Sequence, residues 1–120
     1  MLQLILHGIG DYITQNEWMA LNKGKNTIKG YFACWLHATI YSLPFLLIGS
    51  LNSFFFIYVS HFLIDKYRLA IPLIKLKNWN WKSKNFGFNS ETPAWMAVWL
   101  FIIIDNLLHI ICNYLALRYL

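Results

Sequence analysis

The chain has 120 residues, of which 58% are hydrophobic, 18% aromatic and only 12% charged. A soluble domain carries about 25% charged residues, so this chain has too few charges to cover the surface of a water-soluble fold. Its length fits a single domain over residues 1–120, and its net charge of +5 comes from basic residues in loops between apolar segments. Such loops are topology determinants of membrane proteins, so we expect membrane lipids as partners and no nucleic acid.

The first predicted membrane span covers residues 1–21 and carries a polar stripe on one helical face. No Lys or Arg precedes this apolar segment and no small-residue cleavage site follows it, so we expect it to remain in the membrane. Steps of four residues are about one helical turn and place side chains on the same face. The polar residues that recur at this step are Gln3, His7, Asp11 and Gln15.

The next two predicted spans each carry another pair of polar residues four positions apart. They cover residues 28–48, with His37 and Tyr41, and residues 54–69, with His61 and Asp65. Pro44 lies inside the second span and predicts a kink, because proline lacks the amide hydrogen that a helix interior needs. The uncharged segment 49–53 predicts a tight turn between the two spans.

Residues 72–92 form the one long connection, in which lysines alternate with tryptophan and phenylalanine. This composition can bind single-stranded nucleic acid by stacking, but beside two membrane spans it is typical of an interfacial segment over anionic lipid headgroups. The last predicted span covers residues 93–118 and carries Asp105 and His109. The sequence therefore predicts an all-α fold, a four-span transmembrane helical bundle.

The loop charges predict how this bundle is oriented. The connections after the first and third spans are rich in Lys and Arg, whereas the N-terminus and the turn after the second span have neither. By the positive-inside rule, the basic loops are cytoplasmic and both termini lie outside. The paired residues then fall into two layers, an outer one of His7, Tyr41, His61 and His109, and an inner one of Asp11, His37, Asp65 and Asp105.

Imidazoles and carboxylates that face the interior of a four-helix bundle are the groups from which di-metal sites are built. They suit Zn, Fe or Mn, and we expect a divalent transition metal, zinc first. Two alternatives use the same residues: a metal-free His–Asp network that fixes helix register, and a proton relay. The predicted ligands are His7, Asp11, His37, His61, Asp65, Asp105 and His109, with Tyr41 and Gln15 as hydrogen-bonding partners of the ligands.

The residues from His7 to Lys23 resemble the opening motif of the DUF3307 family. Later elements of that family resemble His37 with Tyr41, the stretch 61–66 and the stretch 105–109, although Asn16 and Asn106 stand where we expect Pro and Gln. The resemblance implies a small integral membrane protein of bacteria or their phages, in the bacterial inner membrane. The chain is also distantly similar to proteins classed as membrane-bound metal-dependent hydrolases of the YdjM type.

The leading functional hypothesis is therefore a metal-dependent hydrolase that acts on a lipid or phosphoester near the membrane. The metal would polarise the ester and lower the pKa of a bound water, with Asp11 or Asp65 as general base. One alternative is a non-enzymatic membrane factor, such as a phage protein that alters the host envelope, with purely structural His–Asp pairs. Another is a proton or ion conduit. The sequence leaves the metal count, the substrate and the oligomeric state open.

Overall fold

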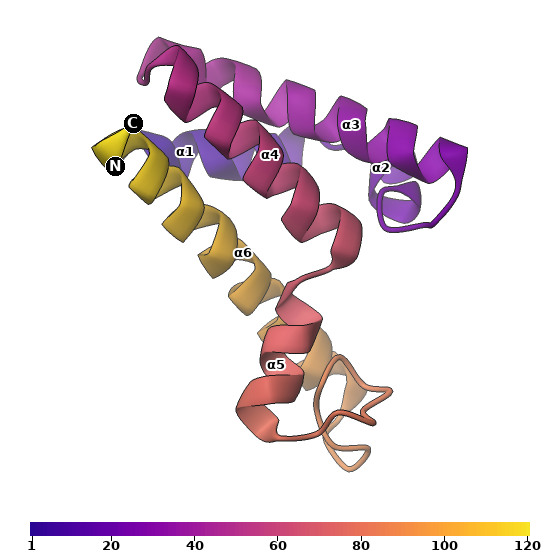
Figure 1. Ribbon diagram of the computed structural model, residues 1–120. Helices are drawn as coiled ribbons and strands as arrows, with labels where there is room; N and C mark the ends of the chain where they lie inside the picture. Colours follow the sequence, from indigo (N-terminus) through magenta and orange to yellow (C-terminus); the bar gives the residue numbers. More distant parts are fainter.

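The computed structural model describes residues 1–120 and contains helices but no strand (Figure 1). This confirms the predicted all-α class. The elements in chain order are α1 (Leu2–Gly8), the π-helical turn η1 (Ile9–Ile13), α2 (Glu17–Asn22), α3 (Ile28–Ser42), the 3-10 helix η2 (Leu43–Leu47), α4 (Leu51–Tyr67), α5 (Ala70–Asn78) and α6 (Ala94–Tyr119).

Side-chain caps explain where three of the helices begin. Asn16, Thr27 and Ser50 each accept a hydrogen bond from the backbone N–H three residues later, at the starts of α2, α3 and α4. The cap at Asn16 divides the first predicted segment, because it starts a separate helix after the π-helical turn. Residues 1–21 are therefore not one continuous helix.

Two further differences from the sequence prediction follow from local chemistry. Pro44 does more than kink the second apolar segment, because α3 ends at Ser42 and continues as the 3-10 helix η2. The long connection contains a helix of its own, α5, which ends where Trp79 adopts a left-handed conformation. An irregular segment from residue 79 to residue 93 then leads into α6.

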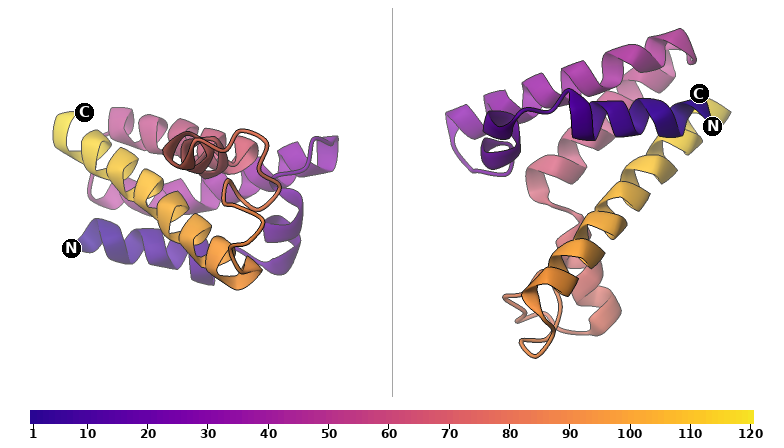
Figure 2. Two further views of the ribbon diagram at one scale, coloured as in Figure 1. Left: turned by 90° about the horizontal axis from the view of Figure 1, so that it is seen from below. Right: turned by 180° about the vertical axis from the view of Figure 1, so that it is seen from behind.

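The chain termini and the turn before α4 lie at one end of the molecule (Figure 1). At this end the hydroxyl of Ser50 donates a 2.9 Å hydrogen bond to the backbone oxygen of Leu120. The helix α4 packs against both α3 and α6, and α1 with η1 lies between α3 and α6, in contact with both (Figure 2). The helix α5 packs on the first part of α6 and extends away from the other helices (Figure 1).

This bundle buries a polar cluster among apolar side chains, with 9 polar or charged residues among its 25 buried residues, and it exposes many large apolar side chains. Along α6 the side chains at one helical face are buried or half-buried, and they include Asp105, His109 and Asn113. The opposite face exposes large apolar side chains at steps of four: Trp99, Ile103, Leu107, Ile111 and Leu115.

One helix, α6, is long and apolar enough to cross a membrane, and only 11% of its most apolar stretch is buried within the protein. The helix α4 has 17 residues and α3 has 15, whereas a membrane-spanning helix needs about 20. Helix length and composition thus identify one candidate span. The first two predicted spans are divided at the Asn16 cap and at Pro44, and α4 ends at Tyr67 because Arg68 adopts a left-handed conformation.

Candidate metal centre

The four paired segments bring their polar residues together where α1, η1, α3, α4 and α6 meet. All four histidines and Asp65 are buried, and Asp11 and Asp105 are half-buried. Asp11 lies on the π-helical turn η1, a local widening of the helix that is often found at functional sites. Two groups of three side chains are close enough to hold a metal ion, and they share His61.

The first group consists of Asp11, His37 and His61. Asp11 Oδ1 lies 3.3 Å from His37 Nε2 and 3.5 Å from His61 Nε2. The two Nε2 atoms lie 2.9 Å from each other. Two nitrogens that face each other at this distance can share only one proton, so at least one of them presents a lone pair to the centre of the group.

The second group consists of His61, Asp65 and His109. Asp65 Oδ2 lies 3.2 Å from His61 Nε2 and also 3.2 Å from His37 Nε2, which belongs to the first group. The other oxygen, Oδ1, lies 3.3 Å from His109 Nε2. The Asp65 carboxylate therefore lies between the two groups, with one oxygen directed toward each side.

The nitrogen–oxygen separations within the two groups are close to those of metal ligands, whereas the 2.9 Å between His37 Nε2 and His61 Nε2 is a hydrogen-bond distance. Nitrogen and oxygen ligands of zinc lie about 2.0–2.2 Å from the ion, which in a tetrahedral site separates them from each other by about 3.3–3.6 Å. The nitrogen–oxygen separations here are 3.2–3.5 Å, longer than most hydrogen bonds. Of the buried atoms in these groups that have no hydrogen-bond partner, two face other candidate ligand atoms: Asp11 Oδ1 in the first group and His109 Nε2 in the second.

The outward ring nitrogens of two histidines depart from a common feature of metal sites. A histidine that binds metal usually donates its other ring N–H to a neighbour, which fixes the ring. The Nδ1 atoms of His37 and His61 have no such partner. The His61 ring is held by packing instead, because it stacks on the Tyr41 ring with centroids 3.6 Å apart.

His7 is part of a separate hydrogen-bond chain and belongs to neither group. The amide nitrogen of Asn106 donates a hydrogen bond to the Ile102 carbonyl. Its amide oxygen Oδ1 then accepts a 2.7 Å hydrogen bond from His7 Nε2. His7 Nδ1 then accepts from the Tyr41 hydroxyl at 2.8 Å, and this hydroxyl accepts from Asn113 Nδ2 at 2.6 Å. Both ring nitrogens of His7 are thus hydrogen-bonded, which leaves neither of them free for a metal ion.

Two other predicted site residues lie at the edge of the groups. Asp105 Oδ2 is 3.5 Å from His109 Nε2, and the Asp105 side chain is 21% exposed. The Gln15 amide donates to the backbone oxygen of Asp11 and not to its carboxylate. Gln15 therefore supports the π-helical turn that carries Asp11.

Sequence reasoning missed Lys23, which it assigned only to a basic loop. Lys23 Nζ donates a 2.7 Å hydrogen bond to Asp65 Oδ2. Burial alone would lower the pKa of Lys23, but the Asp65 carboxylate more than offsets this and the pKa is raised. Asn113 was also missed, although it lies four residues after His109 and thus continues the polar face of α6.

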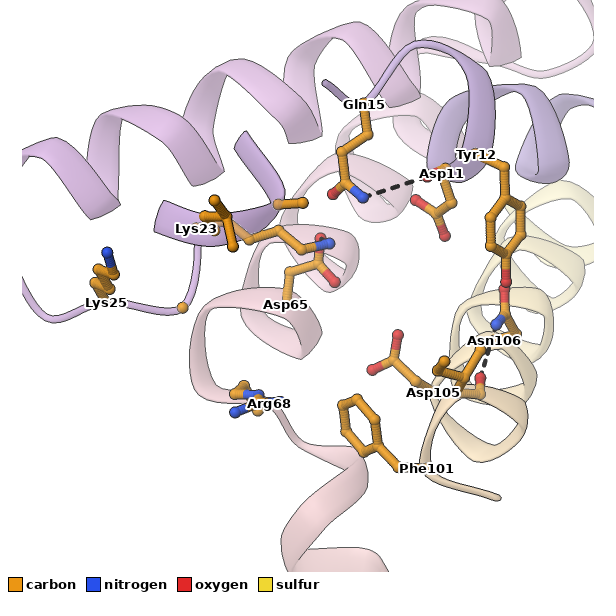
Figure 3. Close-up of a pocket in the computed structure, with 14 residues that line it drawn as sticks. Asp11, Tyr12, Gln15, Lys23, Lys25, Asp65, Arg68, Phe101, Asp105 and Asn106 are labelled. Atoms are coloured by element: carbon orange, nitrogen blue, oxygen red, sulfur yellow. Dashed lines mark hydrogen bonds and ion pairs between the residues drawn. The ribbon is translucent and has the colours of Figure 1, made fainter. Parts of the chain in front are cut away.

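A cavity of about 600 Å³ opens beside the two groups (Figure 3). The carboxylates of Asp11, Asp65 and Asp105 line it together with the cationic residues Lys23, Lys25 and Arg68. Figure 3 shows the side chains of Asp11 and Asp105 pointing into this space from opposite sides. The cavity gives a molecule outside the bundle a route to the buried acids.

Comparison with known families identifies the chain. The model of DUF3307, a family described as a protein of unknown function, matches residues 1–119, and the chain belongs to this family. No curated protein and no solved structure matches the chain.

Replacing Tyr41 by Phe tests the hydrogen-bond chain around His7. The substitution removes the hydroxyl that pairs with both Asn113 and His7, so two buried polar groups lose a partner. We expect the free energy of unfolding in detergent to fall by about 1–3 kcal/mol. Tyr114→Phe is the control, because Tyr114 is exposed, and it should unfold like the wild type. Equal stability of Tyr41→Phe and the control would contradict the assigned chain.

Proposed function

We propose that this member of the DUF3307 family is an integral membrane protein that binds a divalent transition metal, zinc first, and uses it to hydrolyse a lipid or phosphoester. The observation that carries the proposal is the pair of buried atoms without a hydrogen-bond partner. Asp11 Oδ1 and His109 Nε2 lie one in each candidate group. Leaving such atoms unpaired is costly in a buried site, and a bound cation would satisfy both kinds of atom.

The distribution of polar and apolar residues supports a membrane location with four spans. Apolar side chains are exposed on α1, α3, α4 and α6, while the polar pairs of these segments face inward. Polar residues inside a membrane bundle face its interior and mark functional sites. The clustering of both termini and the turn before α4 at one end suits the orientation with both termini outside and the basic loops in the cytoplasm.

The residues that would hold metal are those of the two groups. Asp11, His37 and His61 form one candidate set, and His61, Asp65 and His109 form the other. A single ring nitrogen of His61, Nε2, faces both sets, and its one lone pair would serve one metal ion at a time. Asp105 Oδ2 lies 3.5 Å from the same Nε2 atom of His109 that faces Asp65, so Asp105 would add a carboxylate ligand at the edge of the second set.

The cavity suggests how hydrolysis would proceed. A zinc ion bound here would act as a Lewis acid on the substrate and lower the pKa of a bound water. Asp11 is the better placed general base, because Asp65 is already hydrogen-bonded to the ammonium group of Lys23. Lys23 and Arg68 line the cavity and suit the negative charge of a phosphoester.

A metal-free structural network is the second candidate. The hydrogen-bond chain from Asn113 through Tyr41 and His7 to Asn106 satisfies all its members without an ion. Lys23 likewise pairs with Asp65 without metal. In this case the protein is a non-enzymatic membrane factor, and the polar residues fix how its helices pack.

The metal content of three purified proteins separates these candidates. We expect wild-type protein in detergent to carry about one or two zinc ions per chain by elemental analysis. His61→Ala should lose the metal, because His61 belongs to both groups. The control His7→Ala should retain it, because both ring nitrogens of His7 are hydrogen-bonded elsewhere. Near-zero metal in the wild type would remove the metal site and hydrolysis with it.

Reporter fusions test the proposed orientation. A reporter that is active only in the cytoplasm should give a signal when fused after Lys25 or Lys84, since both lie in basic loops. A fusion at Asn52, in the turn region at the other end, should give a signal only with an external reporter. An external signal from Lys84 would overturn the four-span arrangement.

Hydrolysis is tested with protein reconstituted in liposomes and supplied with a chromogenic phosphodiester or with phospholipid. We expect zinc-dependent release of product that a chelator abolishes. Asp11→Asn should lower kcat by about 10²–10⁴-fold, the usual contribution of a general base, with zinc still held by the set without Asp11, which is His61, Asp65 and His109. Glu91→Gln is the control, because Glu91 is an exposed acid far along the chain from both groups. If zinc-loaded protein hydrolyses neither substrate, the hydrolase proposal is wrong and metal binding alone stands.

A further inference from the structure

The ammonium group of Lys23 donates a hydrogen bond to the carboxylate of Asp65, which lies between the two candidate metal groups. Its Nζ is 2.7 Å from Asp65 Oδ2, and the same oxygen lies 3.2 Å from the Nε2 atoms of His37 and His61. The Lys23 side chain is only 20% exposed and that of Asp65 is 3% exposed. A positive charge of the protein itself therefore stands beside the atoms that would hold a metal ion.

The loop that carries Lys23 is fixed in place. Lys66, the neighbour of Asp65 on α4, is buried. Its ammonium group donates hydrogen bonds to the backbone oxygens of Lys23 and Lys25. Gly30 lets the loop lie directly on α3, because any Cβ at this position would overlap the Lys25 carbonyl oxygen. Asp65 thus holds the side chain of Lys23, and the next residue of α4, Lys66, holds its backbone. A lysine on the protein surface would have neither contact.

We propose that Lys23 is a built-in cation that competes with the metal ion for Asp65 and thereby sets the metal affinity of the site. The inference rests on the metal site of the proposed function. Two cations that share one carboxylate repel each other, so each weakens the binding of the other. Without metal, the ammonium group prevents Asp65 from remaining an unpaired buried charge. When metal binds, the ammonium group leaves Oδ2 and turns toward the cavity, which Lys23 already lines beside Arg68.

Competition predicts that removing the ammonium group strengthens metal binding. Zinc affinity is measured by equilibrium dialysis for wild type, Lys23→Met and Lys29→Met, all as full-length protein in detergent. We expect Lys23→Met to bind zinc about 5–150-fold more tightly, the usual range for coupling between two binding events. Lys29→Met removes the same charge, but Lys29 is exposed and lies outside the cavity, so its affinity should equal that of the wild type. Equal or weaker binding by Lys23→Met overturns the proposal.

A second measurement uses the wild type alone, so it does not depend on how a variant folds. Protein with and without bound zinc is treated briefly with an amine-acetylating reagent, and the modification of each lysine is measured by mass spectrometry. We expect the ratio of Lys23 to Lys25 modification to rise when zinc is bound, because Lys23 is released from Asp65. An unchanged or lower ratio overturns the proposal.

The dialysis results keep this inference separate from the proposed function. If wild type and Lys23→Met bind zinc equally, competition is wrong and the metal site stands. If only Lys23→Met binds zinc, competition stands, and the native protein is not a zinc enzyme. If neither binds zinc, both proposals fail together.

Discussion

The buried carboxylate of Asp65 is the constraint on which the rest of the structure depends. A carboxylate that is 3% exposed must have partners, because an unpaired charge in such a place costs several kcal/mol. Asp65 has four, and they come from four different elements or loops: Lys23 before α3, His37 on α3, His61 on α4 itself and His109 on α6. Satisfying this one group therefore fixes how α3, α4 and α6 pack and where the loop before α3 lies.

The same constraint explains why the interior of the bundle contains a polar cluster. The chain has too few charged residues to cover itself, and Asp11 on η1, Asp65 and Lys66 on α4 and Asp105 on α6 are buried or half-buried. In water this would leave the apolar faces of the helices exposed, which is unfavourable over so large an area. In a lipid bilayer the apolar exterior is solvated, and the inner polar groups find their partners only in one another or in a bound ion.

The pairs at steps of four could be predicted from sequence because helical periodicity alone places both members on one face. That periodicity correctly gave the all-α class and the residues that meet in the bundle. It could not give the interruption at Asn16, where a local cap competes with continuation of an apolar helix. Nor could it give the partners of His7 or the position of Lys23, since these depend on contacts between residues 34 to 99 positions apart. From sequence, a lysine in a loop indicates only membrane topology, whereas the structure shows that this loop packs against α4.

Lys23 and a metal ion would stabilise the same arrangement in different ways. An ion in the first group would hold η1, α3 and α4 together, and an ion in the second would hold α4 and α6 together. Either would stabilise the fold by about 2.7 kcal/mol at a hundredfold excess over Kd. The Lys23–Asp65 pair holds the loop before α3 to α4 without any ion. A protein with both devices would remain folded before it acquired metal. The repulsion between the two cations would then lower the metal affinity below the value that the ligands alone would give, so a more stable metal-free fold would mean weaker metal binding.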